Sequence, residues 1–161
     1  MKKFMMFVAF AAMCVTANAQ QKWAYESNYT EGIACVKDAN GKWGHINEQG
    51  KLVGQMWRNV KYFREGLAAV SKTVDNWLKY GFIDKTGKEV IPFKYRSAYS
   101  FSEGLAPVSE DDKTFGYIDK SEKVVIPFKF KKAYPFEHGK ARVQDENGNW
   151  RKIDKTGKFI D

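Results

Sequence analysis

The sequence predicts an all-β fold of four tandem units, each a three-stranded antiparallel meander of about 35 residues, stacked as an open or curved array. The segment YGFIDKTGKEVIPFKY, which begins at Tyr80, recurs as FGYIDKSEKVVIPFKF from Phe115. A second phrase, FREGLAAV at Phe63, precedes such a segment and also recurs. Its glycines lie 34, 38 and 35 residues apart, at Gly32, Gly66, Gly104 and Gly139. Self-similarity at a fixed period is typical of repeat architectures.

The first strand of each unit follows the repeat glycine. An Ala and a Val two residues apart recur in every copy, as Ala34 and Val36 do in the first. Side chains two apart share one face of a strand, so we expect this face in the core. The position between them varies, which argues against a special role for Cys35; it holds Cys35, Ala69, Pro107 and Arg142.

Turns separate the strands, and the second strand has the form aromatic-Gly-aromatic-Ile. The segments 38–41 and 84–87 begin with Asp and end with Gly, which favours a type I turn closed by a left-handed residue. In the third copy Glu122 replaces that glycine. A non-glycine residue there costs about 1 kcal/mol, so we expect a strained or remodelled turn.

The third strand is KEVI or KVVI, and Pro92 and Pro127 are predicted to end its pairing because proline lacks an N–H. A sheet of three short strands cannot hide its apolar face alone, so neighbouring units must stack. The units lie near 23–56, 57–94, 95–129 and 130–161. Because the chain begins and ends partway through a unit, a small closed propeller-like ring is an alternative. We favour the open array, since four such blades make a cramped ring.

Residues 1–19 have the layout of a secretory signal peptide, with Lys2 and Lys3, an apolar stretch, and a small-x-small site at 17–19. A buried N-terminal helix and a lipoprotein at Cys14 are alternatives. We therefore expect an exported protein, periplasmic, cell-surface or secreted, with a single domain at 20–161. No later apolar stretch is long enough to span a membrane.

Charge and cysteine content limit the partners. Removal of Lys2 and Lys3 leaves 25 basic against 19 acidic residues, a net charge of +6 that mildly favours anionic partners. Cys35 is then the only cysteine, so no intramolecular disulfide can form. We expect a monomer, and the modest charge together with export disfavours a nucleic acid ligand.

The repeated motif resembles the WG-repeat (KWG-repeat) family of bacterial proteins over nearly the whole chain after the signal. Copy four departs from the pattern at Arg151 and His138, and copy one lacks the Val-Ile-Pro step. The resemblance implies a β-rich repeat module, often exported and mostly without an assigned activity. No catalytic residues come with the motif.

The residues themselves give little support to catalysis. Glu31, Glu65 and Glu103 recur once per repeat, which favours a structural role in which they bond nearby backbone N–H groups. His45 and His138 occupy different repeat positions, and a metal site needs three or four ligands. The sequence has no nucleophile or phosphate-binding motif. We expect no enzyme, no cofactor and no metal.

Two repeated features could form a binding surface. Turn lysines would line one edge as a basic stripe for an anionic glycan, or serve only solubility; they are Lys85, Lys120 and Lys155, each followed three residues later by another lysine. An aromatic column could stack on sugars, or form the core between repeats, which we favour. It comprises Trp23, Trp57, Tyr95 and Phe130.

The sequence therefore predicts an exported, non-catalytic repeat module that binds a protein or an envelope glycan. The alternative is an envelope polysaccharide hydrolase in which Glu65 and Glu103 are the carboxylate pair, since such enzymes need two carboxyl groups about 5–10 Å apart. Bonding of these glutamates to backbone amides would exclude that alternative.

Overall fold

The computed structural model describes residues 23–160, which form an all-β chain of fourteen strands in four antiparallel sheets. The segment predicted as a signal peptide, 1–19, lies outside the described residues. Among the residues described, no helix is long and apolar enough to cross a membrane.

Each sheet corresponds to one repeat, and its strands pair in chain order. The first sheet contains β1 (Tyr25–Glu26), β2 (Ile33–Lys37) and β3 (Trp43–Asn47). The second contains β4 (Asn59–Val60), β5 (Leu67–Val74), β6 (Trp77–Asp84) and β7 (Glu89–Tyr95). The third contains β8 (Ser97–Ala98), β9 (Ala106–Ser109), β10 (Phe115–Ile118) and β11 (Val124–Phe130). The fourth contains β12 (Lys132–Ala133), β13 (Ala141–Gln144) and β14 (Trp150–Ile153).

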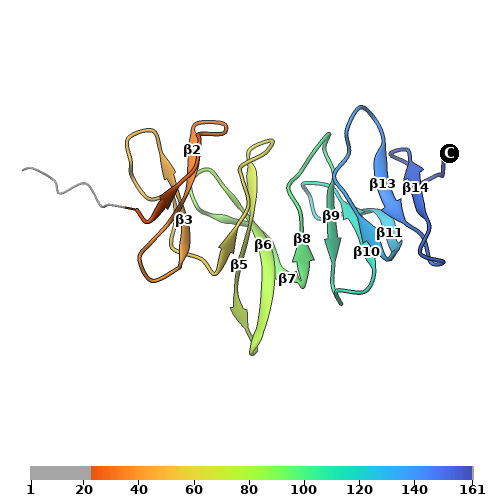
Figure 1. Ribbon diagram of the computed structural model, residues 1–161, viewed down its shortest axis with the longest axis horizontal. Helices are drawn as coiled ribbons and strands as arrows, with labels where there is room; N and C mark the ends of the chain where they lie inside the picture. The colour runs from red at the N-terminus through yellow and green to blue at the C-terminus, as the bar shows by residue number, and fades with distance from the viewer. Residues whose placement is uncertain (1–22, 161) are drawn as a thin grey trace, which may run out of the picture.

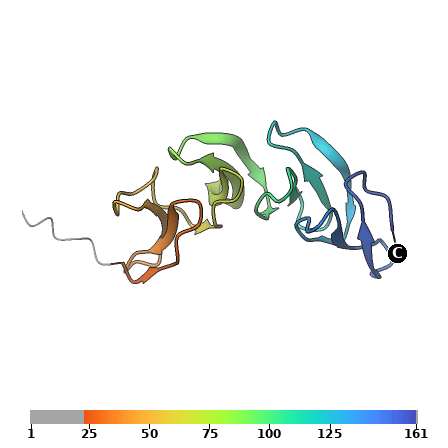
Figure 2. The ribbon, with the colours of Figure 1, turned by 90° about the horizontal axis from the view of Figure 1, so that it is seen from above.

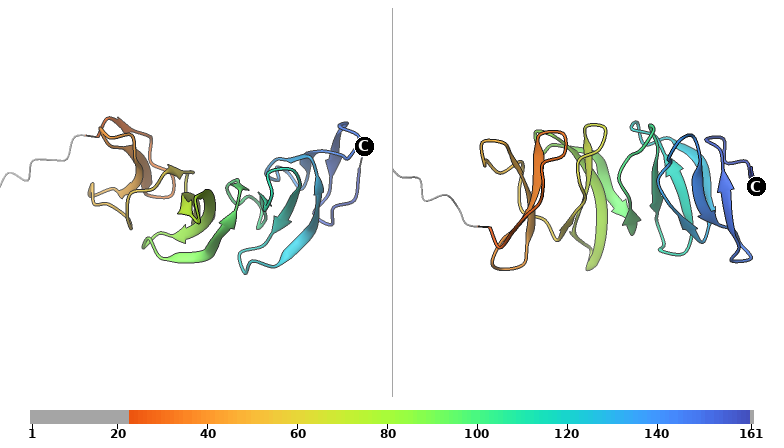
Figure 3. Two further views of the ribbon diagram at one scale, coloured as in Figure 1. Left: turned by 90° about the horizontal axis from the view of Figure 1, so that it is seen from below. Right: turned by 45° about the horizontal axis from the view of Figure 1, so that its top comes forward.

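The four sheets follow one another along the long axis of the molecule, and the first and last sheets lie at opposite ends (Figure 1). Seen from above or below, the row bends into a shallow arch (Figures 2 and 3). None of the sheets pairs with another to close a ring. The predicted open, curved array is confirmed, and the propeller-like alternative is not formed.

The prediction of three strands per unit is incomplete. A two-residue strand leads each repeat and pairs antiparallel with the Ala-x-Val strand, as β4 does with β5. The two inner sheets therefore have four strands. In the first repeat the third strand is reduced to two isolated bridges, Ile46 with Leu52 and Trp43 with Trp57, and in the last to the bridge of Ile153 with Phe159.

The prediction that Pro92 and Pro127 end their strands is wrong. Strand β7 runs through Pro92 to Tyr95, and β11 runs through Pro127 to Phe130. Both are the last strand of their sheet, where one side of the backbone has no ladder partner. Each pairing also contains register shifts, so the missing N–H falls at an irregular position on an edge strand.

The Asp-to-Gly turns have the predicted form. Asp84 accepts a bond from the Gly87 N–H at 2.9 Å, and Gly87 has a φ of +85°. Glu122 takes the same left-handed conformation with a φ of +70°. Its carboxylate lies 2.6 Å from the ammonium of Lys94 in the preceding repeat. The third copy thus keeps the turn geometry, and the ion pair offsets part of the backbone strain.

The glycine of the aromatic-Gly motif is required where a third strand crosses it. A Cβ at Gly81 would lie 2.6 Å from the Ile91 carbonyl oxygen, and one at Gly116 would lie 2.6 Å from that of Ile126. In the fourth repeat the equivalent strand, β14, is the edge of its sheet. Arg151 can therefore replace the glycine, and its guanidinium lies 4.4 Å above the Phe159 ring.

The core is divided into apolar interfaces between consecutive sheets, and we call each of these interfaces a seam. At each junction, a ring of the aromatic-Gly strand contacts the repeat phenylalanine of the next repeat. The centroid distances are 4.8 Å for His45–Phe63, 5.0 Å for Phe82–Phe101 and 5.0 Å for Tyr117–Phe136. The recurring Ala and Val residues pack on the other side of the same sheets, as Ala106 and Val108 do against the second repeat. Each sheet is therefore completed by its neighbours.

We predict that Gly116→Ala lowers the free energy of unfolding by about 2–3 kcal/mol, because its methyl group meets backbone atoms rather than a movable side chain. Gly50→Ala is the matched control, since Gly50 has a positive φ but open space around it. It should cost only about 1 kcal/mol. Equal losses in urea denaturation would contradict the steric explanation.

Candidate functional site

The Glu-Gly step of the first three repeats, and His138-Gly139 in the fourth, forms a two-residue hairpin turn. In the first repeat, Glu31 has a φ of 54° and Gly32 a φ of 80°. Thr30 and Ile33 exchange backbone hydrogen bonds of 2.8 and 3.1 Å across them. Two positive φ values in a two-residue loop are characteristic of a type I′ turn. The glutamate is thus strained at a position where glycine or asparagine is preferred, which indicates that its side chain has a specific role.

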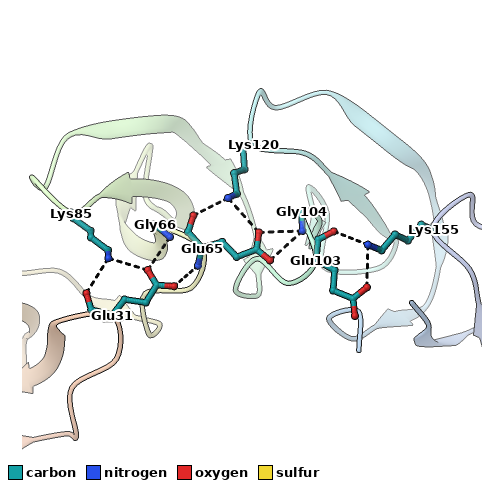
Figure 4. A network of polar contacts seen from close by, with 8 residues as sticks. All are labelled: Glu31, Glu65, Gly66, Lys85, Glu103, Gly104, Lys120 and Lys155. Carbon is teal, nitrogen blue, oxygen red and sulfur yellow. Dashed lines mark hydrogen bonds and ion pairs between the residues drawn. The ribbon is translucent and has the colours of Figure 1, made fainter. Parts of the chain in front are cut away.

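That role is to bind the next repeat (Figure 4). The Glu65 carboxylate accepts a hydrogen bond from the Gly104 N–H at 3.1 Å, and it lies 3.3 Å from the Lys120 ammonium. Lys120 also donates to the Glu65 backbone carbonyl at 2.8 Å. We call this three-part contact the Glu–Gly–Lys clamp. Residues 23–160 contain three clamps: Glu31–Gly66–Lys85, Glu65–Gly104–Lys120 and Glu103–Gly139–Lys155.

The clamps account for the repeated carboxylates. The Gly139 N–H and the Lys155 ammonium hold the pKa of the Glu103 carboxyl below its ordinary value. A general acid of a glycosidase needs the opposite shift. Both Glu65 and Glu103 are bonded to backbone amides, so the hypothesis that makes them the catalytic pair of a hydrolase is not supported.

The clamps also account for the predicted basic stripe. Lys85, Lys120 and Lys155 do lie in a row along the array (Figure 4). Each has a side chain exposed by 45–47% but is paired with a glutamate of the preceding repeat. Because every ammonium has a carboxylate beside it, this row presents little net positive charge to an anionic ligand.

The first and fourth repeats depart from the consensus at positions that form the clamps in the other repeats. Glu48 stands in the first repeat where the clamp lysine would be, and no repeat precedes it among the described residues. His138 stands in the fourth repeat where the clamp glutamate would be, and no repeat follows it there. Both departures from the clamp pattern thus lie in the first and last of the described repeats.

The predicted aromatic column lies mostly in the interior. Trp57, Tyr95 and Phe130 are only 5%, 1% and 1% exposed. Trp23 is half-buried and packs against the outer face of the first sheet, beside Ala34. Trp57, Tyr95 and Phe130 serve packing in the core and offer no face to a sugar, whereas Trp23 covers the first sheet.

Sequence analysis missed a second set of aromatic rings, in which Tyr134 and Trp150 are exposed and Tyr99 is partly buried. The Tyr99 and Tyr134 rings lie 6.2 Å apart, and Tyr134 stacks on Trp150 at 5.7 Å with an interplanar angle of 30°. The Lys61 ammonium lies 5.7 Å from the Tyr99 ring, which extends the series into the second repeat. We call Lys61, Tyr99, Tyr134 and Trp150 the aromatic row. The dipeptides Ala98-Tyr99 and Ala133-Tyr134, each five residues before a repeat glycine, were the available signal.

The remaining reactive side chains are buried or separated. His45 is fully buried, its Nε2 lies 2.9 Å from the Lys61 carbonyl oxygen, and burial lowers its pKa so that it stays neutral. Burial raises the pKa of the Cys35 thiol to about 11, which leaves it unreactive at neutral pH. Within residues 23–160, no three His, Cys, Asp or Glu side chains are grouped as metal ligands.

Comparison with known proteins agrees with this architecture. A family model described as "WG containing repeat" matches residues 43–73, 80–113 and 115–150. The chain belongs to the WG-repeat family. The search of curated proteins found no match to this WG-repeat chain.

Solved structures give a likeness in fold alone. The crystal structure of the computationally designed Ika4 protein has a TM-score of 0.50 and 14% sequence identity, over 78% of this chain and 87% of that one. The designed Ika8 protein has a TM-score of 0.47 and 14% identity, over 79% of this chain and 44% of that one.

We predict that Glu65→Gln lowers the free energy of unfolding by about 1 kcal/mol, because it removes the carboxylate that joins the second and third repeats. His138→Glu restores the repeat consensus where no following repeat is described, and should change stability by less than about 0.5 kcal/mol. Chemical denaturation checks both values. A gain from His138→Glu as large as the loss from Glu65→Gln would show that the glutamate stabilises its own turn.

Proposed function

We propose that this WG-repeat protein is a non-catalytic binding module that acts outside the cytoplasm, as a monomer, on an envelope glycan or a protein. The observation that carries the proposal is the aromatic row, whose rings follow one another at 5.7–6.2 Å across the third and fourth repeats. Tyr134 and Trp150 are 42% and 39% exposed although both take part in ring stacking. A series of adjacent, partly exposed rings, in which Tyr134 stacks on Trp150 and Tyr99 is tilted against Tyr134, is a surface on which a polymer can lie.

The rings of the row are held in place by contacts behind them. Tyr99 packs on Phe115 at a centroid distance of 6.3 Å. The Tyr117 hydroxyl donates a 2.8 Å hydrogen bond to the Tyr134 backbone carbonyl. Side chains that are already ordered lose little conformational entropy when they bind a ligand. Such a surface can therefore bind a polymer through several equivalent contacts that are each weak.

The chemistry of the row favours a glycan over a protein. Sugar rings present apolar C–H faces to aromatic rings, and a repeating polysaccharide can occupy several rings of an extended row. A protein partner would use the same tyrosines and tryptophan as anchors, since these residue types dominate protein interfaces. Export rests on the N-terminal segment 1–19 and remains part of the proposal. The assignment as non-catalytic is supported by the structural use of the recurring glutamates.

We predict that the purified protein co-sediments with insoluble envelope polysaccharide at low and at high salt, because ring stacking depends little on ionic strength. Tyr134→Ala should weaken binding about 5-fold, on the basis of about 1 kcal/mol for one aromatic contact. Trp77→Ala is the control, since Trp77 is 57% exposed but lies outside the row.

Equal losses in the two variants, or no co-sedimentation at any salt concentration, would contradict glycan binding through the row. Pelleting that is lost at high salt would indicate only generic attraction by cations. Either result would favour a protein partner.

A further inference from the structure

The seam between the first and second repeats contains a histidine among its apolar side chains. His45, in β3, is fully buried and stands where the next two repeats have Phe82 and Tyr117. Like them, it contacts the phenylalanine of the following repeat, with the centroids of the His45 and Phe63 rings 4.8 Å apart. Because phenylalanine or tyrosine fills this position at the other two junctions, packing alone does not require a histidine here.

The contacts of the His45 ring define its protonation state. Its Nε2 lies 2.9 Å from the Lys61 carbonyl oxygen, which can only accept a hydrogen bond, so Nε2 carries the proton. Its Nδ1 is buried and has no hydrogen-bond partner within residues 23–160. A second proton would therefore create a buried imidazolium whose new N–H meets no acceptor, which is strongly unfavourable.

The groups that face His45 do not offset such a charge. The Cys35 thiol lies opposite it in the register of β2 and β3, and burial raises the pKa of this thiol to about 11, so it stays neutral. Trp57 Nε1, also buried at this junction, is a hydrogen-bond donor and cannot accept from an imidazolium. The polar and charged side chains of the adjoining segments are exposed or engaged elsewhere: Arg58 and Arg64 are exposed, Glu31 pairs with Lys85, Glu65 with Lys120 and Lys72 with Glu89, the Lys61 ammonium lies by the Tyr99 ring, and Tyr62 bonds Tyr25.

The direction of the pH effect follows from this environment. Burial lowers the pKa of His45 and the Lys61 carbonyl raises it by less, so the pKa lies below its ordinary value of 6.5. In an opened junction the imidazole is hydrated and regains an ordinary pKa. Below about pH 6.5 the open form therefore binds a proton that the closed form does not, and a fall in pH favours opening.

The other contacts between repeats do not respond in this pH range. Phe82 has no titratable group, and burial raises the pKa of Tyr117, which therefore stays neutral. Burial raises the pKa of the Glu31 carboxyl, but the Gly66 N–H and Lys85 lower it further, to below its ordinary value of 4.5, so this clamp keeps its charge. Since a repeat array is held by contacts between neighbours, one junction can open while the others stay closed.

We propose that His45 makes the junction between the first and second repeats an acid-sensitive joint, which opens at mildly acidic pH while the other two junctions stay closed. Opening exposes apolar side chains of the seam, among them Ile33 and Phe63. It also releases the Lys61 backbone at the N-terminal end of the aromatic row. The inference goes beyond the proposed binding function and does not depend on it.

Native-state amide hydrogen exchange of the full-length protein at pH 7 and pH 5, corrected for intrinsic exchange rates, tests the proposal. We expect the opening constants of amides in β2 and β3 to rise about 10-fold, within the limit of about 10-fold per pH unit below 6.5 that one proton allows. Amides in β9, β10, β13 and β14 should change less than about 2-fold. No change in β2 and β3, or an equal rise in all four sheets, would overturn the proposal.

Three variants assign the effect to one side chain. His45→Phe supplies the ring that the second repeat has, and His45→Gln keeps a donor for the Lys61 carbonyl; neither side chain titrates in this range. In both variants the opening constants in β2 and β3 should differ by less than about 2-fold between pH 7 and pH 5. His138→Gln is the matched control, because His138 is the other histidine of the chain and is exposed, and it should keep the full response.

Each variant is compared with itself at the two pH values, so a change in its overall stability does not affect the comparison. Two substitutions at His45 are used because Phe leaves the Lys61 carbonyl without its donor, whereas Gln does not. A full pH response that persists in the His45 variants, or one that disappears in His138→Gln, would overturn the assignment to His45.

Discussion

The structure depends on contact between consecutive sheets, because no sheet of three or four short strands can bury its own apolar face. The seams supply the buried area, and the Glu–Gly–Lys clamps fix how one repeat sits on the next. A clamp uses a glutamate in a left-handed backbone conformation that costs about 1 kcal/mol. The carboxylate offsets this cost by binding the Gly N–H of the next turn, as Glu65 does with Gly104. The strained backbone conformation of Glu65 is thus stabilised by a hydrogen bond to Gly104, which lies 39 residues later in the chain.

The same constraint explains the ends of the array. Glu48 and His138 replace clamp residues where no partner repeat is described, and Arg151 replaces a glycine in a sheet that has no third strand within residues 23–160. These departures follow from the position of each repeat. In a repeat protein, the features that depart from the period without a structural reason are the best candidates for function.

Sequence patterns were sufficient to predict the features that depend on residues close together in the chain. Alternation of Ala and Val, turn chemistry and the glycine period predicted the strands, the turns and the open array. They failed where tertiary position decides: Pro92 is tolerated because β7 is an edge strand, and the two-residue strands have too little pattern to be recognised. The clamps could not be paired from sequence, since Glu31 and Lys85 are 54 residues apart. Exposure of Tyr134 and burial of Phe130 likewise depend on which side of the seam each ring occupies.

Native-state hydrogen exchange of the repeat glycine amides tests the central claim that each glutamate holds the turn of the following repeat. The account predicts that the N–H groups of Gly66, Gly104 and Gly139 are protected to a similar degree as the adjacent strands. The N–H of Gly32, for which residues 23–160 contain no preceding clamp glutamate, should exchange much faster. Equal protection at all four glycines, or rapid exchange at all four, would contradict the clamp as the contact that joins the repeats.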